Sequence, residues 1–263
     1  MNSTRTDAYL ERLGAERPAR ATTEALRDLH LRHLRAVPFE NLSIHLGEPV
    51  VLKEDALLDK VVARHRGGFC YELNGAFGLL LASLGYQVRL LAGRVHGDDG
   101  LGIPYDHLAL RVRTVDGGDL IADVGFGAHS HLPLEFGERG DQADPGGTFR
   151  VVEAGDGDLD VIQDGEPQYR LETRPRALPD FRVGAWWHST APESRFTQSL
   201  VCSRITEDGG RITLSGRTLT TTDAAGHRTV DELGTDGEVL AVYRDGFGVG
   251  LGEVPTVRGG QFG

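Results

Sequence analysis

The sequence predicts an α+β fold of three consecutive segments, and three changes of pattern along the chain predict it. Residues 1–85 carry apolar side chains at helical spacing, and residues 86–185 form short β-rich runs broken by Gly/Asp turns. Residues 186–263 return to a mixture of strands and helix. We expect an N-terminal helical bundle, a middle β-domain that is a small barrel or sandwich, and a mixed C-terminal domain.

Helices are expected throughout the first segment, because each apolar stripe there ends at a glycine or before a proline. Their sequences are DAYLERLG, TTEALRDLHLRHLRAVP, EDALLDKVVARHRGG and YELNGAFGLLLASLG. Glycine at the end of a periodic apolar run is a common helix stop, and proline cannot continue a helix. The four stretches therefore predict a helical bundle with short connections.

Short strands are expected in the middle segment, at 86–96, 106–115, 119–126, 148–154, 159–163 and 167–173. The sequence VDGG at 115–118 is typical of a hairpin tip. In the last segment, 196–206, 210–222 and 226–233 are predicted to be antiparallel strands, and 236–248 is predicted to be a closing helix.

Composition excludes several classes of function. The formal net charge of −11 argues against nucleic acid or an anionic membrane surface as a partner. No apolar run approaches the ~20 residues of a membrane helix, and the N-terminus lacks a secretory signal, so a cytoplasmic protein is expected. Cys70 and Cys202 lie far apart, without CxxC or zinc spacing, so neither a metal nor a disulfide is expected.

The stretch RGGFCYELN places Cys70 where one predicted helix ends and the next begins. Unpaired backbone N–H groups and the positive end of the helix dipole favour a thiolate there. The same N–H groups are suited to an oxyanion, and Gly67 and Gly68 would let a substrate approach the backbone. Cys202 shows no such surroundings and is expected to be structural.

A nucleophilic thiolate needs a base and a group that orients it. His107 opens a predicted strand, and Asp123 lies near the end of the next, which suggests a Cys–His–Asp triad. The other histidines considered are expected to be solvated or structural: His30, His33, His45, His65, His96 and His227. A hairpin tip at Gly117–Gly118 would offset His107 from Asp123 by five residues, so their contact requires a bulge, a shifted tip or another pairing.

Taken together, RGGFCYELN, VPFENL (37–42), DHLALRV, IADVGFG and STAPESRF (189–196) resemble the arylamine N-acetyltransferase family over nearly the whole chain. The resemblance implies a helical bundle (1–85), a β-barrel (86–185) and an α/β lid (186–263), with a papain-like core of Cys70, His107 and Asp123. It also implies acetyl-CoA as acyl donor, an acetyl-cysteine intermediate, and an arylamine or arylhydrazine as acceptor in a ping-pong reaction. Xenobiotic metabolism is the expected role, and a homodimer is possible.

The resemblance extends to residues of the substrate cleft. It implies that Phe39 and Phe126 line the acceptor cleft, and Tyr71 is expected there because it follows the nucleophile. Phe39 fits a core position equally well. Asp106 stands where many relatives carry an uncharged residue, so it would place an acid beside the site.

The donor side is expected to involve Gly125, Gly127 and Phe196. The two glycines would admit the pantetheine arm, although a turn at the strand end explains them equally, and Phe196 would border the coenzyme A cleft. Trp186 and Trp187 are expected to be packing or interface residues.

Three other functions fit parts of the same pattern. An amide synthase of the same fold, closing a macrolactam from a carrier-bound polyketide, would keep the same triad. A papain- or transglutaminase-like thiol hydrolase and a ligand-binding homologue without activity fit less well. The amide synthase would differ from an acetyltransferase because it would not transfer an acetyl group from acetyl-CoA to a simple arylamine.

Overall fold

The structure is a computed structural model that describes residues 1–257. Its first part is helical, as expected, and its helices end where the sequence supplies stop signals. Gly14, with φ of +61°, ends the first helix, and extended Val37 before Pro38 ends the second. The helices of this part are α1 (Ser3–Leu13), α2 (Thr23–Ala36), α3 (Leu42–Leu46), α4 (Glu54–Leu58), its π-helical continuation η1 (Asp59–Ala63) and α5 (Cys70–Ser83).

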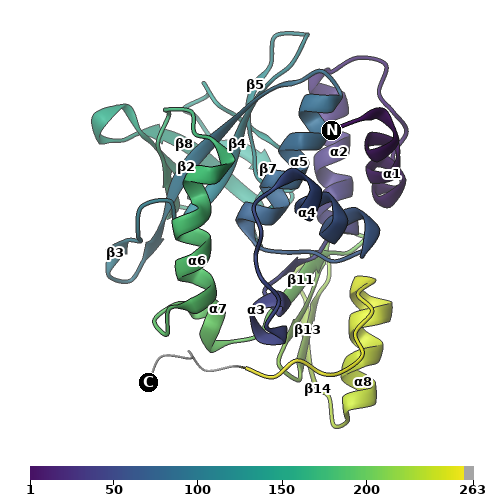
Figure 1. The fold of residues 1–263 in the computed structure, drawn as a ribbon. Helices are drawn as coiled ribbons and strands as arrows, with labels where there is room; N and C mark the ends of the chain where they lie inside the picture. The colour runs from purple at the N-terminus through teal and green to yellow at the C-terminus, as the bar shows by residue number, and fades with distance from the viewer. Residues whose placement is uncertain (258–263) are drawn as a thin grey trace.

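Helix α5 lies at the centre of the molecule, between the other helices and the strands β2 and β4 (Figure 1). Leu73, Phe77, Leu80 and Leu81 are completely buried along it. A helix that is apolar on nearly every side belongs in a core, because burial of apolar surface is its main source of stability. The first residue of this central helix is Cys70.

The middle part is a nearly closed antiparallel barrel, so of the two expected architectures the barrel is present and the sandwich is not. Its strands are β2 (Gln87–Gly97), β3 (Gly100–Leu101), β4 (His107–Arg113), β5 (Asp119–Ala122), β6 (Leu134–Glu135), β7 (Gln142–Asp144), β8 (Gly147–Glu153), β9 (Leu159–Gln163) and β10 (Glu166–Leu171). They are ordered β6-β5-β4-β2-β10-β9-β8-β7, and β3 pairs with β2. The Gln142 side chain joins the two edge strands, because it accepts from the Glu135 N–H (2.7 Å) and donates to the Glu135 carbonyl (3.1 Å).

The β4–β5 hairpin resolves the offset between His107 and Asp123. Leu110 pairs with Ala122 and Arg113 with Asp119, so the turn is centred on residue 116 and not on Gly117–Gly118. In this register Asp123 falls opposite position 109, two residues from His107. Residues two apart on a strand share a face. A shifted tip therefore brings the two side chains together, and the five-residue offset does not occur.

The last part combines a second sheet with helices. Its elements are η3 (Leu178–Phe181), α6 (Arg182–Thr190), α7 (Arg195–Gln198), β11 (Cys202–Ile205), β12 (Arg211–Ser215), β13 (Thr218–Thr222), β14 (Arg228–Glu232), α8 (Asp236–Ala241) and the π-helical η4 (Val242–Gly246). The short 3₁₀-helix η2 (Gly155–Gly157) lies in the barrel. The sheet and α8 form the end of the molecule opposite the barrel, and α6 runs along the barrel (Figure 1).

Three details differ from expectation. The strand β1 (Phe39–Glu40), within the segment expected to be helical, pairs with β11 of the C-terminal sheet. Residues 195–198 form the short helix α7 where a strand was expected from 196, because the Ser194 hydroxyl accepts from the Phe196 N–H and caps a helix. Helix α6 crosses the boundary expected at residue 185.

In the described part of the chain, no helix combines the length and apolar character that a bilayer span requires.

Candidate active site

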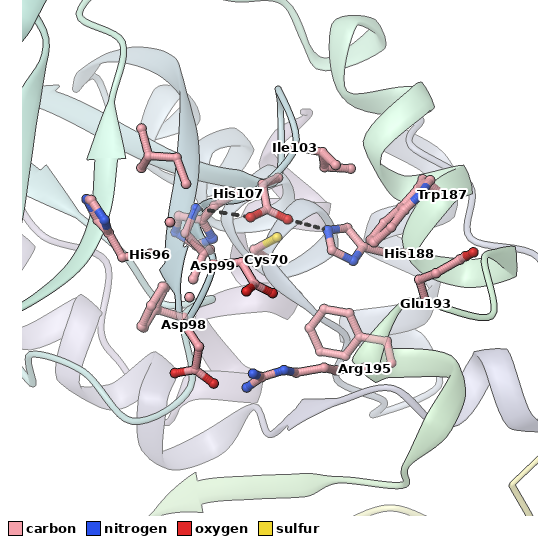
Figure 2. A pocket seen from close by; sticks show the side chains of 18 of the residues that line it. Cys70, His96, Asp98, Asp99, Ile103, His107, Trp187, His188, Glu193 and Arg195 are labelled. Atoms are coloured by element: carbon pink, nitrogen blue, oxygen red, sulfur yellow. Dashed lines mark hydrogen bonds and ion pairs between the residues drawn. The ribbon is translucent and has the colours of Figure 1, made fainter.

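Cys70 lies at the bottom of a cavity of about 520 Å³ between the barrel and α6–α7 (Figure 2). Its side chain is buried, with 4% of the residue exposed. As predicted, the residue opens α5, so its backbone lies in the first turn, where N–H groups have no partner within the helix. The sequence signal for this position was the glycine pair before the cysteine.

The glycines before Cys70 have a different role from the one predicted. A Cβ at Gly67 would lie 1.8 Å from the Pro38 carbonyl oxygen, and one at Gly68 would lie 2.5 Å from a Glu72 carboxylate oxygen. The Glu40 N–H also donates to the Gly68 carbonyl (2.8 Å). Protein atoms fill the space that a substrate was expected to use. The glycines therefore let VPFENL pack against RGGFC.

Two buried ion pairs stabilise the contact between VPFENL and RGGFC. Arg66 lies 2.9 Å from the Glu40 carboxylate, and Lys60 donates to Glu72 at 2.7 Å. Burial would raise the pKa of Glu40, but the charges of Lys60 and Arg66 lower it overall. Buried charges need such partners, and removing one member leaves the other uncompensated. The pairs fix the start of α5 and thus the position of Cys70.

His107 connects the cysteine to the carboxylate. Its Nε2 lies 2.7 Å from Asp123 Oδ2, so the Nδ1 side of the ring is left for Cys70. Burial would lower the pKa of His107, yet the charge of Asp123, its hydrogen bond and the interaction with Cys70 raise that pKa to about 10. The imidazole is therefore protonated at neutral pH. The three predicted catalytic residues are brought together as one unit.

Asp123 is held from three sides besides His107. Asn74 Nδ2 and the Gly125 N–H donate to its Oδ1 at 2.8 and 3.0 Å. Its backbone N–H donates to His30 Nε2 (3.2 Å), and His30 Nδ1 donates to the His131 carbonyl (2.9 Å). Burial would raise the pKa of Asp123, but the charge and hydrogen bond of His107 lower it overall. The carboxylate is thus ionised and fixed in orientation.

Sequence reasoning missed Asn74 and gave His30 no part in the site. Asn74 lies one turn after Cys70, donates to the Leu108 carbonyl (2.6 Å) and accepts from the Val124 N–H (2.9 Å). It therefore joins the helix that begins at Cys70 to the segments that carry His107 and Asp123. A buried amide four residues after a nucleophile, on an apolar helix, was the available signal.

The protonated His107 predicts an unusual pH dependence of Cys70 reactivity. Because His107 keeps its proton up to its pKa of about 10, and a neighbouring imidazolium stabilises a thiolate, iodoacetamide should alkylate Cys70 faster in the wild type than in His107→Gln at neutral pH. The alkylation rate should also rise less between about pH 6 and pH 9 in the wild type than in the variant, because only the wild type keeps the imidazolium beside the sulfur. Mass-spectrometric timing of carbamidomethyl-Cys70 measures both. Equal profiles for the two proteins would contradict the ion pair.

Gly125 packs against the Cys70 backbone, and Gly127 makes a turn. A Cβ at Gly125 would lie 2.6 Å from the Cys70 Cα and 2.8 Å from Asn74 Nδ2. Gly125 also lines the cavity. Gly127 has φ of +98°, a conformation that favours glycine, and its carbonyl accepts from Arg211 (2.9 Å). The close approach at Gly125 thus serves the protein backbone.

Gly125→Ala should therefore lower both stability and activity. Forcing a methyl group against the Cys70 backbone is expected to cost about 1–3 kcal/mol of unfolding free energy. The thermal midpoint should fall by about 2–4 °C for each kcal/mol. Gly137→Ala is the matched control, because nothing lies within 4 Å of its added methyl group. Equal melting curves for the two variants would show that the Gly125 contact is unimportant.

Aromatic side chains form much of the cavity wall. Phe39, Phe126 and Phe196 line it, with the Phe39 and Phe196 rings 6.0 Å apart and Phe126 edge-on to His107 at 5.2 Å. Trp187, expected to be a packing or interface residue, also lines it, whereas Trp186 is 63% exposed. Such walls suit flat apolar ligands.

Tyr71 does not reach the cavity. Its side chain is fully buried, and its hydroxyl donates to the carbonyls of Tyr105 (2.7 Å) and Asp106 (3.0 Å). Because it follows Cys70 by one residue, the helix turns it by about 100° to another side. Tyr71 supports the loop before His107.

Cys202 is completely buried in the C-terminal core, and burial raises the pKa of its thiol.

Asp106, the acid that precedes His107, already has hydrogen-bond partners. Asp106 accepts from the Val95 N–H (3.0 Å) and lies 2.8 Å from His188 Nε2. Both Asp106 and His188 line the cavity. The carboxylate thus ties β2 to α6, and it is a poor candidate for a free charge that selects substrates.

Fold and site together define a papain-like thiol enzyme, with a cysteine at a helix N-terminus and a histidine and carboxylate on adjacent strands. A family model described as N-acetyltransferase matches residues 22–256. The chain belongs to the arylamine N-acetyltransferase family, and it is an acyltransferase.

Individual relatives agree over nearly the whole chain. An arylamine N-acetyltransferase of Mycobacterium tuberculosis is 35% identical over 256 residues, which is 94% of this chain and 90% of that protein. The Salmonella typhimurium arylamine N-acetyltransferase structure superposes with a TM-score of 0.87 at 33% identity, covering 97% and 94% of the two chains. The Mycobacterium marinum enzyme in complex with CoA gives 0.83 at 36% identity, covering 93% and 92%.

Proposed function

We propose that this protein transfers an acetyl group from acetyl-CoA, through Cys70, to the nitrogen of an arylamine or arylhydrazine. The observation that carries the proposal is the buried Cys70–His107–Asp123 unit at the bottom of an aromatic-lined cavity. Family membership and the CoA complex of a relative support the choice of donor. The cavity, about 520 Å³, is of the size that small-molecule sites have.

The residues of the unit divide the chemistry between them. The Cys70 thiolate attacks the thioester carbonyl, and the N–H groups at the start of α5 stabilise the oxyanion. Because one thioester replaces another, the acetyl-cysteine forms with little change in bond energy. His107 donates a proton to the departing thiolate and later removes one from the attacking nitrogen. Asp123 keeps the ring in the required tautomer. This sequence predicts ping-pong kinetics.

The aromatic wall supports an aromatic acceptor. Phe39 and Phe126 would contact it, and Phe196 would border the donor arm. Anilines and aryl hydrazides are weak bases, so they are neutral and nucleophilic at neutral pH. We place the reaction in the cytoplasm, where both free cysteines would remain reduced, and xenobiotic amines are one source of acceptors.

Intact-protein mass spectrometry tests the proposal directly. Incubation with acetyl-CoA should add one acetyl group, located on Cys70, and 4-aminobenzoate or an aryl hydrazide should then remove it. Absence of acetylation, with Cys70 still open to alkylation, would reject the proposal and favour an amide synthase that uses a carrier-bound donor. Loss of the acetyl group at the same rate without an amine would instead indicate a thiol hydrolase.

A further inference from the structure

The mouth of the cavity carries mostly negative charge. Among the described residues that line it, Asp98, Asp99 and Glu193 are exposed carboxylates, and Arg195 is the only lysine or arginine. Asp98 and Asp99 come from the connection between β2 and β3, whereas Glu193 and Arg195 come from the other wall (Figure 2). An anionic ligand entering here would meet repulsion from three acids and attraction from one guanidinium.

Arg195 is placed to receive a ligand. It is the first residue of α7, next to the cavity-lining Phe196, and its exposed side chain extends on the side of the cavity where Asp98 lies (Figure 2). Within residues 1–257, no carboxylate lies within ion-pairing distance of its guanidinium. This differs from Arg66 and Arg170, whose guanidiniums are paired with acids.

We propose that Arg195 binds the phosphate groups of the acyl donor, and that the neighbouring carboxylates, Asp98 above all, limit the affinity for that donor. The inference rests on the proposed acetyl-CoA-dependent function. A coenzyme A thioester carries a diphosphate and a phosphate at the end remote from the reacting carbonyl. A guanidinium offers paired N–H donors that match phosphate oxygens, and such charge-assisted hydrogen bonds are strong. Arg195 is therefore a specificity-determining residue for the donor.

Two donors separate this role from a structural one. Acetyl-CoA and S-acetyl-N-acetylcysteamine carry the same thioester, but only the first has phosphates. In Arg195→Gln, the ratio of kcat/KM for acetyl-CoA to kcat/KM for the neutral thioester should fall about tenfold, the size of one charge-assisted contact. Arg195→Lys should restore most of the ratio. Asp98→Asn should raise it about threefold, because it removes a repulsive charge on the side toward which the Arg195 side chain extends.

The controls make the outcomes distinct. Arg20→Gln removes an exposed arginine that does not line the cavity, and it should leave the ratio as in the wild type. An unchanged ratio in Arg195→Gln would overturn the role of Arg195, and a lower ratio in Asp98→Asn would overturn the role of the carboxylates. Acetylation of Cys70 by both donors would still uphold the proposed function. If neither donor acetylates Cys70 in the wild type, both proposals are wrong.

Discussion

Replacing Cys70 by alanine is expected to abolish acetyl transfer, with a loss of more than about 10⁴-fold in kcat. Alanine cannot form a thioester, and the cavity has no other thiol, because Cys202 lies in the C-terminal core. Family membership alone would not require this outcome. The geometry does, since His107 and Asp123 converge on this one position.

The measurement combines steady-state assays with mass spectrometry of the acetylated protein. Cys70→Ala should take up no acetyl group, whereas Cys202→Ala, the matched control, should be acetylated like the wild type. Truncating a buried cysteine leaves only a small cavity, so the control should still fold. Residual transfer by Cys70→Ala within tenfold of wild type would mean that the amine attacks the donor directly, and the covalent mechanism would then be excluded.

The order of helical and β-rich segments and the helix start at Cys70 could be predicted from the sequence because their signals are local, whereas the proposed triad rested on the resemblance to a family. Glycine and proline stops define the ends of α1 and α2, and the glycine pair marks the junction that α5 begins. The start of β4 at His107 followed from its strand pattern. In each case, neighbours in the chain determine the structure.

The parts that were wrong or missing depend on contacts between distant segments. Gly67 is required by the Pro38 carbonyl, and Gly125 by the Cys70 backbone, but neither partner is visible from the local pattern. The hairpin register follows from the whole β4–β5 pairing, so a tip misplaced by about one and a half residues gave the wrong offset. Asn74 looked like one polar residue on an apolar helix until the strands supplied its partners.

Asp123→Asn is expected to lower kcat by about 10³–10⁴-fold while the fold is kept. The reason lies in the hydrogen bonds around the carboxylate. Asn74 and the Gly125 N–H both donate to Oδ1, so in the variant the amide oxygen should stay on that side. The amide NH₂ would then face His107 Nε2, which must act as an acceptor and carry its proton on Nδ1. A ring in that tautomer cannot accept a proton from Cys70.

The loss of charge adds a second effect in the same direction. Burial lowers the pKa of His107, and the charge of Asp123 is the largest of the effects that raise it. The variant lacks this charge, so its His107 should be neutral at neutral pH. Cys70 alkylation should then resemble that of His107→Gln in its pH profile. Asp119→Asn is the control, because Asp119 begins the same strand but pairs with Arg111 on the barrel surface. If Asp123→Asn keeps the wild-type profile and loses activity only by unfolding, Asp123 is a packing residue and does not orient His107.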